Sequence, residues 1–161
     1  MDNGLIEAAT VLAAVGSATV GGVFFAFSTL VMPALGRRPA SEATASMQSI
    51  NVKAVNPLFM GALFGTGMAC VGLAVAAVTV VHGPARVLLL VGSGAYLLGD
   101  IALTIAFHVP RNDALAALDP NEAGVADHWN RYLAGWTAGN HVRAAAALVA
   151  AVSLTVALRI G

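Results

Sequence analysis

The chain has 161 residues, of which 58% are hydrophobic and only 10% charged, and its formal net charge is zero. Its mean hydropathy is +0.82, whereas an ordinary soluble domain has about 25% charged residues. This composition excludes a soluble globular domain and indicates a membrane protein. No basic run is longer than the pair Arg37 and Arg38, which excludes a nucleic-acid-binding face.

The first apolar segment runs from about residue 7 to residue 35 and exceeds the roughly 20 residues that a helix needs to cross a bilayer. Its start carries Asp2 and Glu7 where a cleavable signal would carry positive charge. We therefore predict a membrane helix that remains in the mature protein. The segment closes with GVFFAFSTLVMPAL, which supplies three candidate site residues, Phe27, Ser28 and Met32.

A hydrophilic connection, residues 36–55, follows the first segment. Its stretch SEATASMQSIN opens with Ser41 and is rich in helix-forming residues. This pattern predicts a short interfacial helix that ends near Asn51.

The second apolar segment covers about residues 56–81 and begins with Asn56 and Pro57. Proline favours the first position of a helix, so we predict that the second membrane helix begins there. Cys70 lies inside this segment and is the only cysteine, which excludes an intramolecular disulfide. We interpret it as a packing residue.

Glycines recur in the second and third apolar segments. Gly61 and Gly65 have the spacing that lets membrane helices approach closely, and VGSGAYLLG in the third segment is similarly rich in glycine. We interpret these glycines as packing residues, and they leave open a homo-oligomer formed through the same faces.

The third apolar segment, at about 86–108, carries a polar residue at every fourth position, which places these residues on one face of a helix. An ionised aspartate inside a bilayer costs at least a few kcal/mol, so Asp100 should face the bundle interior. It is either a functional residue or a structural partner of Arg143 or of nearby hydroxyl groups. The stripe consists of Tyr96, Asp100, Thr104 and His108.

The second long connection, residues 109–139, contains Pro110 and Pro120, where we predict helix breaks. A helical pattern resumes near residue 123 and leads into a fourth membrane segment at about 138–159. Trp129, Tyr132 and Trp136 recur at steps of three and four and therefore share one face. They form either an aromatic belt at the membrane surface or the wall of a pocket.

Four apolar segments predict one domain, residues 1–161, folded as an all-α integral membrane four-helix bundle, because lipid accommodates only helices or closed barrels. Both long connections then lie on one side, and both termini lie on the other. Positive residues are more frequent on the side of the long connections, which predicts that this side is cytoplasmic, and we expect a bacterial inner membrane. The residues on that side are Arg37, Arg38, Lys53, Arg111, Arg131 and Arg143, against Arg86 and Arg159 on the other.

Polar side chains gather at the same end of all four segments, which predicts a pocket that opens toward the long connections. Histidine takes and returns protons near neutral pH, so His141 is our candidate base. The candidate catalytic residues are His141, Arg143, Asn140 and Asp100. The candidate substrate-binding residues are Phe27, Ser28, Met32, Asn51, Asn56, Thr104, His108, Asn112, Trp129, Tyr132 and Trp136.

Four stretches carry a recognisable pattern: GVFFAFSTLVMPAL, MQSINVKAVNPLFM, TIAFHVPRNDAL and WNRYLAGWTAGNHVR. Together they resemble the membrane family known as DUF1772 or anthrone oxygenase-like, over nearly the whole chain. The chain departs from that family at three positions. His108 replaces an Asn, Gly139 replaces an aromatic residue, and Asp100 has no acidic counterpart. The matching positions are Phe27, Ser28, Met32, Pro33, Met47, Asn51, Asn56, Pro57, Pro110, Asn112, Leu115, Trp129, Tyr132, Trp136, Asn140, His141 and Arg143.

The resemblance implies oxygenation of anthrones to anthraquinones in polyketide pathways, with dioxygen as co-substrate and without flavin or metal. His141 would remove a proton from the substrate, and Arg143 with Asn140 or Asn112 would stabilise the enolate. The partners expected are a hydrophobic aromatic small molecule and the lipid bilayer.

Two rival functions stay open. One is a non-catalytic membrane module that binds a lipid, a quinone or a partner protein. The other is a metal- or haem-dependent redox protein, for which His108, His141 and Asp100 resemble a two-histidine, one-carboxylate ligand set. No HxxxH or ExxH spacing supports that set.

Overall fold

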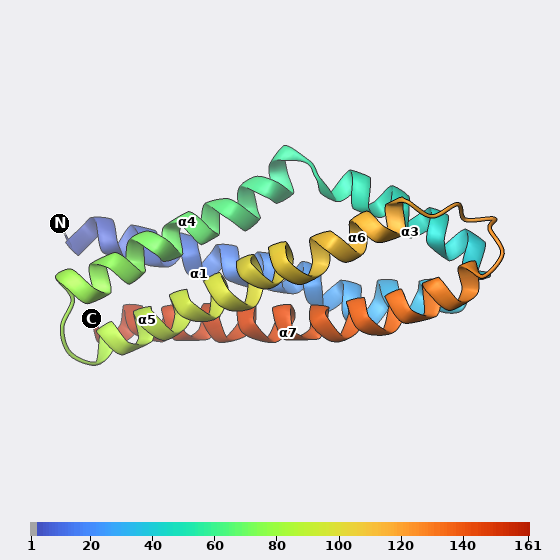
Figure 1. Cartoon of the computed structure of the whole chain (residues 1–161). Helices are drawn as coiled ribbons and strands as arrows, with labels where there is room; N and C mark the ends of the chain where they lie inside the picture. The colour runs from blue at the N-terminus through green and yellow to red at the C-terminus, as the bar shows by residue number, and fades with distance from the viewer. Residues whose placement is uncertain (1–2) are drawn as a thin grey trace.

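The computed structural model describes residues 3–161, and every regular element in them is a helix (Figure 1). Four helices are long and apolar enough to cross a membrane: Gly4–Leu35, Pro57–Thr79, Pro84–Ala116 and Val125–Ile160. Both termini lie at one end of the bundle (Figure 1). The predicted all-α fold with four membrane helices is therefore confirmed.

The first span consists of α1 (Asn3–Ala26), a π-helical segment η1 (Phe27–Val31) and α2 (Met32–Leu35). It is followed by α3 (Ala40–Ala54), which confirms the short helix predicted between the first two spans. The next helix, α4 (Pro57–Thr79), begins as predicted. The Asn56 side chain accepts a hydrogen bond from the backbone N–H of Phe59 at 3.0 Å and caps the helix.

The third span is longer than predicted. It consists of α5 (Pro84–Tyr96), the π-helical segments η2 (Leu97–Ala102) and η3 (Thr104–His108), and α6 (Val109–Ala116). The predicted break at Pro110 is therefore wrong. A loop follows, and α7 (Val125–Ile160) begins thirteen residues before the predicted fourth segment. The whole stretch WNRYLAGWTAGNHVR thus lies within a single helix.

The π-helical turns explain why two prolines bend helices without ending them. Both η1 and η3 end two residues before a proline, Pro33 and Pro110. Just before each proline, the backbone N–H of Met32 bonds to Phe27 and that of Val109 to Thr104, five residues back. A proline ring collides with the carbonyl four residues earlier, and a wider turn gives it room.

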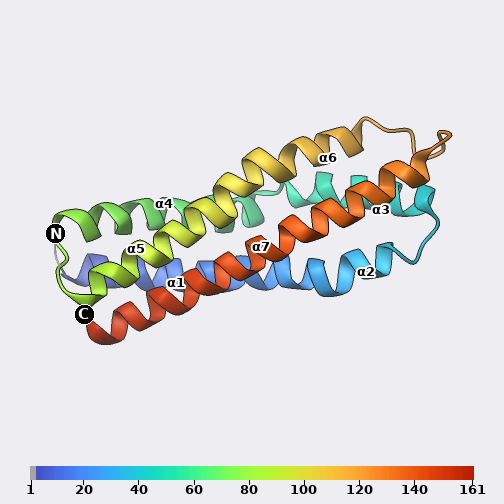
Figure 2. The same ribbon diagram turned by 60° about the horizontal axis from the view of Figure 1, so that its bottom comes forward.

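The four spans form a bundle in which α7 and α4 each pack along both α1 and α5 (Figure 2). At 1.5 Å per residue α4 is about 34 Å long, which suffices for a hydrocarbon core of about 30 Å. The other three spans extend past the start of α4 and pack with α3. We call this extension the cap; its buried core consists of Met32, Leu35, Ala43, Met47, Leu115, Trp129, Tyr132 and Trp136.

The three aromatic residues predicted to share one face of a helix pack inside the cap. Trp129, Tyr132 and Trp136 are all buried, and the rings of Trp129 and Tyr132 stack at a centroid distance of 5.8 Å. A belt facing lipid requires exposed rings, so that interpretation is wrong, and only Trp136 reaches a cavity wall.

The glycines divide into two groups. A Cβ at Gly92 would lie 2.8 Å from Leu154, and one at Gly99 would collide with Ala146, so these two glycines allow close helix contacts, as predicted. No atom lies within 4 Å of a Cβ at Gly61 or Gly65. Their predicted role in packing is therefore wrong within one chain. Cys70 is fully buried, in agreement with a packing role.

Candidate functional site

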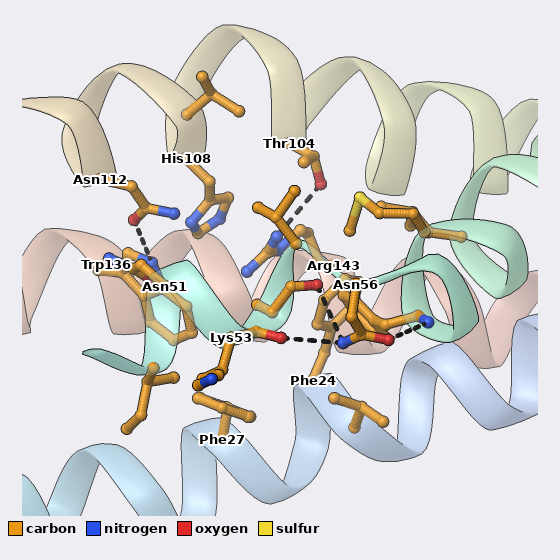
Figure 3. A pocket seen from close by; sticks show the side chains of 18 of the residues that line it. Phe24, Phe27, Asn51, Lys53, Asn56, Thr104, His108, Asn112, Trp136 and Arg143 are labelled. Carbon is orange, nitrogen blue, oxygen red and sulfur yellow. Dashed lines mark hydrogen bonds between the residues drawn. The ribbon is translucent and has the colours of Figure 1, made fainter. Parts of the chain in front are cut away.

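A cavity of about 500 Å³ lies where α4 begins, between the cap and the membrane part of the bundle. Side chains from α1, α3, α4, the third span and α7 line it, and most of its wall is apolar (Figure 3). The polar lining residues are Asn51, Lys53, Asn56, Thr104, His108, Asn112 and Arg143.

Arg143 is the central polar residue of this site, and its side chain is only 5% exposed. Its Nη1 donates to the Thr104 hydroxyl at 3.1 Å, and its Nη2 donates to the Asn140 side-chain oxygen at 2.6 Å. The guanidinium carbon lies 4.0 Å from the centre of the Phe24 ring, a cation–π contact. Neighbours from three spans thus fix the guanidinium at the cavity wall.

This buried cation forms no close ion pair, although the buried Asp100 carboxyl is near enough to interact with it electrostatically. Within residues 3–161 the only side-chain ion pair joins Arg38 to Glu42, and both are exposed. The Nε of Arg143 also has no hydrogen-bond partner. Because a buried charge is costly unless it is paired, the arrangement favours a ligand that brings a negative or strongly polar oxygen to Arg143.

Asn140 lies behind Arg143 and does not line the cavity. Its side-chain nitrogen donates to the backbone oxygen of Phe24 at 2.6 Å and to the Ser28 hydroxyl at 2.7 Å. Asn140 thus ties α7 to the first span, and it orients Arg143 without facing a ligand itself.

Asn112 presents a donor to the cavity. Its side-chain oxygen accepts from the Tyr132 hydroxyl at 2.9 Å and from the Trp136 indole nitrogen at 3.1 Å. Indole N–H groups only donate, so the atom that they meet must be the amide oxygen. The Asn112 NH2 group is therefore left for a neighbour in the cavity (Figure 3).

His108 contributes its ring to the same wall. The ring packs edge-on against Trp136 and Phe107, with both centroid distances at 5.2 Å. Neither ring nitrogen has a hydrogen-bond partner. A Cβ at Gly139 would lie 3.0 Å from Nε2, so the glycine gives the imidazole its space.

A family model described as anthrone oxygenase matches residues 57–153, which is more than half of the chain. The chain belongs to the anthrone oxygenase family. The matched part of this anthrone oxygenase family member includes α4, the third span and most of α7, and therefore His108, Asn112 and Arg143. No curated protein and no solved structure matches the chain.

The structure places His141 outside the cavity of this family member. Its side chain is exposed on α7, whereas Arg143, two residues later, is buried. Residues two apart point to different sides of a helix, so both could not face one cavity. The prediction that His141 shares the pocket with Arg143 is wrong.

The predicted two-histidine, one-carboxylate set is not assembled either. Within residues 3–161 no three His, Cys, Asp or Glu side chains lie close enough to hold one metal ion. His108 faces the cavity, His141 faces outward, and Asp100 does not line the cavity. These three side chains therefore do not form a ligand set.

Asp100 faces the bundle interior, as predicted, and is fully buried. Neither carboxyl oxygen has a hydrogen-bond partner. The expected structural partners make their hydrogen bonds elsewhere: the Tyr96 hydroxyl donates to the backbone oxygen of Leu63 at 3.0 Å, and Arg143 donates to Thr104 and Asn140. Arg143 interacts with Asp100 only electrostatically, without a hydrogen bond. Asp100 lies beside the site without lining it.

The remaining predicted site residues fall into two groups, those that line the cavity and those that are buried outside it. Those that line the cavity are Phe27, Asn51, Asn56, Thr104, His108, Asn112, Trp136 and Arg143. Those that are buried outside it are Ser28, Met32, Trp129 and Tyr132.

Sequence reasoning missed much of the apolar wall. Phe24 lies one helical turn before Phe27, and Met60 and Leu63 lie on the same face of α4 as Asn56. Helical periodicity could have found these residues, because they recur at steps of three and four. Lys53 and Ile50 at the end of α3 were also missed, and they depend on how α3 packs.

Proposed function

We propose that this protein is a membrane-bound oxidoreductase that oxygenates an anthrone-like aromatic polyketide to a quinone, with dioxygen as co-substrate and no cofactor. Family membership supports an oxygenase-like role. The observation that carries the proposal is a buried guanidinium that forms no close ion pair and faces a mostly apolar cavity.

The cavity suits a flat aromatic molecule. Its volume of about 500 Å³ lies within the range of about 300–1,000 Å³ that is common for small-molecule sites. Phe24, Phe27, Phe59 and Trp136 supply ring surfaces around it. A tricyclic ketone would bury its rings among them and place its oxygen near Arg143.

The reaction converts a ring CH2 and O2 into a ring C=O and water. A base removes one proton from the CH2, the resulting enolate reduces O2, and the protonated base returns that proton to the peroxide oxygen to give a hydroperoxide on that carbon. The base then takes the second C–H proton, which cleaves the O–O bond and releases hydroxide, and it gives this proton to the hydroxide to form water. All electrons come from the substrate carbon.

Arg143 and Asn112 would bind the enolate oxygen. Their N–H groups are fixed before the ligand arrives, and preorganised donors of this kind stabilise a developing oxyanion in a site that excludes water. Thr104 and Asn140 would keep the guanidinium in place during turnover.

His108 takes the role of base that the sequence suggested for His141. Within residues 3–161 it is the only histidine that lines the cavity. Both ring nitrogens of His108 are buried and have no hydrogen-bond partner. A turn of the side chain would therefore bring one of them to the substrate.

We further propose a bacterial inner membrane as the location, with the cap and its long connections on the cytoplasmic side. The positive residues near the cap support this orientation. Substrate oxygenation would then take place close to the cytoplasmic surface.

Oxygen uptake by the purified protein with a simple anthrone tests the proposal, after correction for spontaneous oxidation. Because a general base contributes about 10²–10⁴-fold, His108→Ala should lower the enzymatic rate by about that factor. His82→Ala, at the exposed turn before α5, is the matched control and should not change it.

Two other results would contradict parts of the proposal. Loss of activity in His141→Ala with retention in His108→Ala would return the role of base to His141. Uptake no faster than background in the wild type would contradict the oxygenase and favour a non-catalytic binding module.

A further inference from the structure

The cavity wall is incomplete between α4 and the third span. Phe64 on α4 and Ile105 and Val109 on the third span line the cavity, yet they are 44%, 56% and 44% exposed. Because both helices belong to membrane spans, these apolar side chains border an opening in the side of the bundle.

The opening arises where two helices separate. Most of α4 packs along α5 and η2. Toward its N-terminal end α4 diverges from the third span, and Figure 1 shows this end of α4 apart from α6. The third span continues through its π-helical segments into the cap, whereas the chain before α4 turns away into α3.

The depth of the opening places it in the bilayer. Phe64 lies seven residues after Pro57, or about 10 Å at 1.5 Å per residue. Since α4 is just long enough for the hydrocarbon core, this position is within the leaflet nearest the cap. A second, polar rim lies closer to the headgroups, where Lys53 and Asn56 are exposed.

We infer that the substrate enters sideways from the lipid, between α4 and the third span, past Phe64, Ile105 and Val109. This inference rests on the proposed function and narrows its substrate class to neutral aromatic ketones that dissolve in the bilayer. The keto form crosses the apolar opening, and charge develops only once the oxygen reaches Arg143 and Asn112.

A gate can be distinguished from a binding contact by kinetics. A side chain that only narrows the entrance slows association and release by the same factor, so Kd does not change. A side chain that contacts the bound ligand changes Kd, mostly through the release rate.

The test uses 9-anthracenemethanol, a stable neutral tricyclic probe, and protein in phosphatidylcholine vesicles. Stopped-flow measurement follows energy transfer to the probe from Trp129 and Trp136, the only two tryptophans. In the double variant Ile105→Phe, Val109→Phe, association and release should both slow by about tenfold, with Kd unchanged. Leu98→Phe is the matched control, because Leu98 is exposed on the same span and does not line the cavity.

Three results would overturn lateral entry. In the first, Lys53→Phe slows association and release of the probe and the double variant does not. In the second, the double variant changes only Kd, and in the third the wild type does not bind the probe. None of them measures oxygen uptake, so lateral entry and the oxygenation reaction fail or survive separately.

Discussion

The two ends of the bundle are built on different principles. Toward the termini, small residues such as Gly92 and Ala150 let regular α-helices pack closely. Toward the cap, π turns, aromatic rings and hydrogen-bonded polar groups keep the helices apart. The space for a ligand thus comes from a local departure from close packing.

Volume alone does not make either end a site. A second hollow of about 420 Å³ lies near the termini, lined by aliphatic side chains, Thr10 and the exposed Glu7. Among residues 3–161, no buried charged group and no aromatic ring lines this hollow. What distinguishes the cap end is Arg143, held by Thr104 and Asn140 with donors left over.

Of the changes that separate the two ends of the bundle, removal of this charge should have the largest effect on activity. Arg143→Met takes away the proposed oxyanion donor, and loss of one such donor costs about 10²–10³ in kcat. Oxygen uptake with an anthrone measures the change. Arg86→Met, an exposed arginine at the opposite end, is the control. Equal rates for both variants would contradict the role assigned to Arg143.

Alanine at a close-packed glycine tests both ends with the same chemical change. Gly92→Ala would collide with Leu154, and Gly139→Ala with Phe107 and His108. Overpacking costs about 1–3 kcal/mol, so both variants should melt earlier. Only Gly139→Ala should also lower activity, because it displaces a ring that lines the cavity. Equal activity in the two variants would show that the contact between Gly139 and His108 does not contribute to the site.

Asp100→Asn should change stability in the opposite direction. The carboxyl is fully buried and neither oxygen has a hydrogen-bond partner, and burying a charge costs more than burying a neutral amide unless a close ion pair compensates it. The neutral amide of similar shape should therefore raise the melting temperature of the purified protein. Lower stability would show that Asp100 has a partner that holds its charge.

Hydropathy predicted the four spans, because an apolar run of sufficient length has no other stable arrangement in lipid. It did not predict that Pro110 bends a helix, since that outcome depends on tertiary packing in the cap. The stripe from Tyr96 to His108 was placed correctly. In an α-helix each step of four overshoots a full turn, and the π turns offset this drift.

The error at His141 has a different origin. Asn140, His141 and Arg143 are close in sequence, and their chemistry suggested one cluster. Helix geometry turns His141 away from Asn140 and Arg143, and only the packing of α7 against the first span decides which side faces inward. The cavity-lining residues of α3 and α4 were likewise hard to predict, because their positions depend on contacts between distant segments of the chain.

Gly61→Ala should have the smallest effect, and it tests the glycine spacing that the sequence emphasised. A Cβ there meets no atom within 4 Å, and alanine is favoured over glycine in a helix by about 1 kcal/mol. The variant should melt at the same temperature or slightly higher, whereas Gly92→Ala melts lower. A lower melting temperature that depends on protein concentration would instead place Gly61 in an interface between two copies of the chain. The glycine pattern would then serve assembly, and close packing within one chain would rest on the other glycines alone.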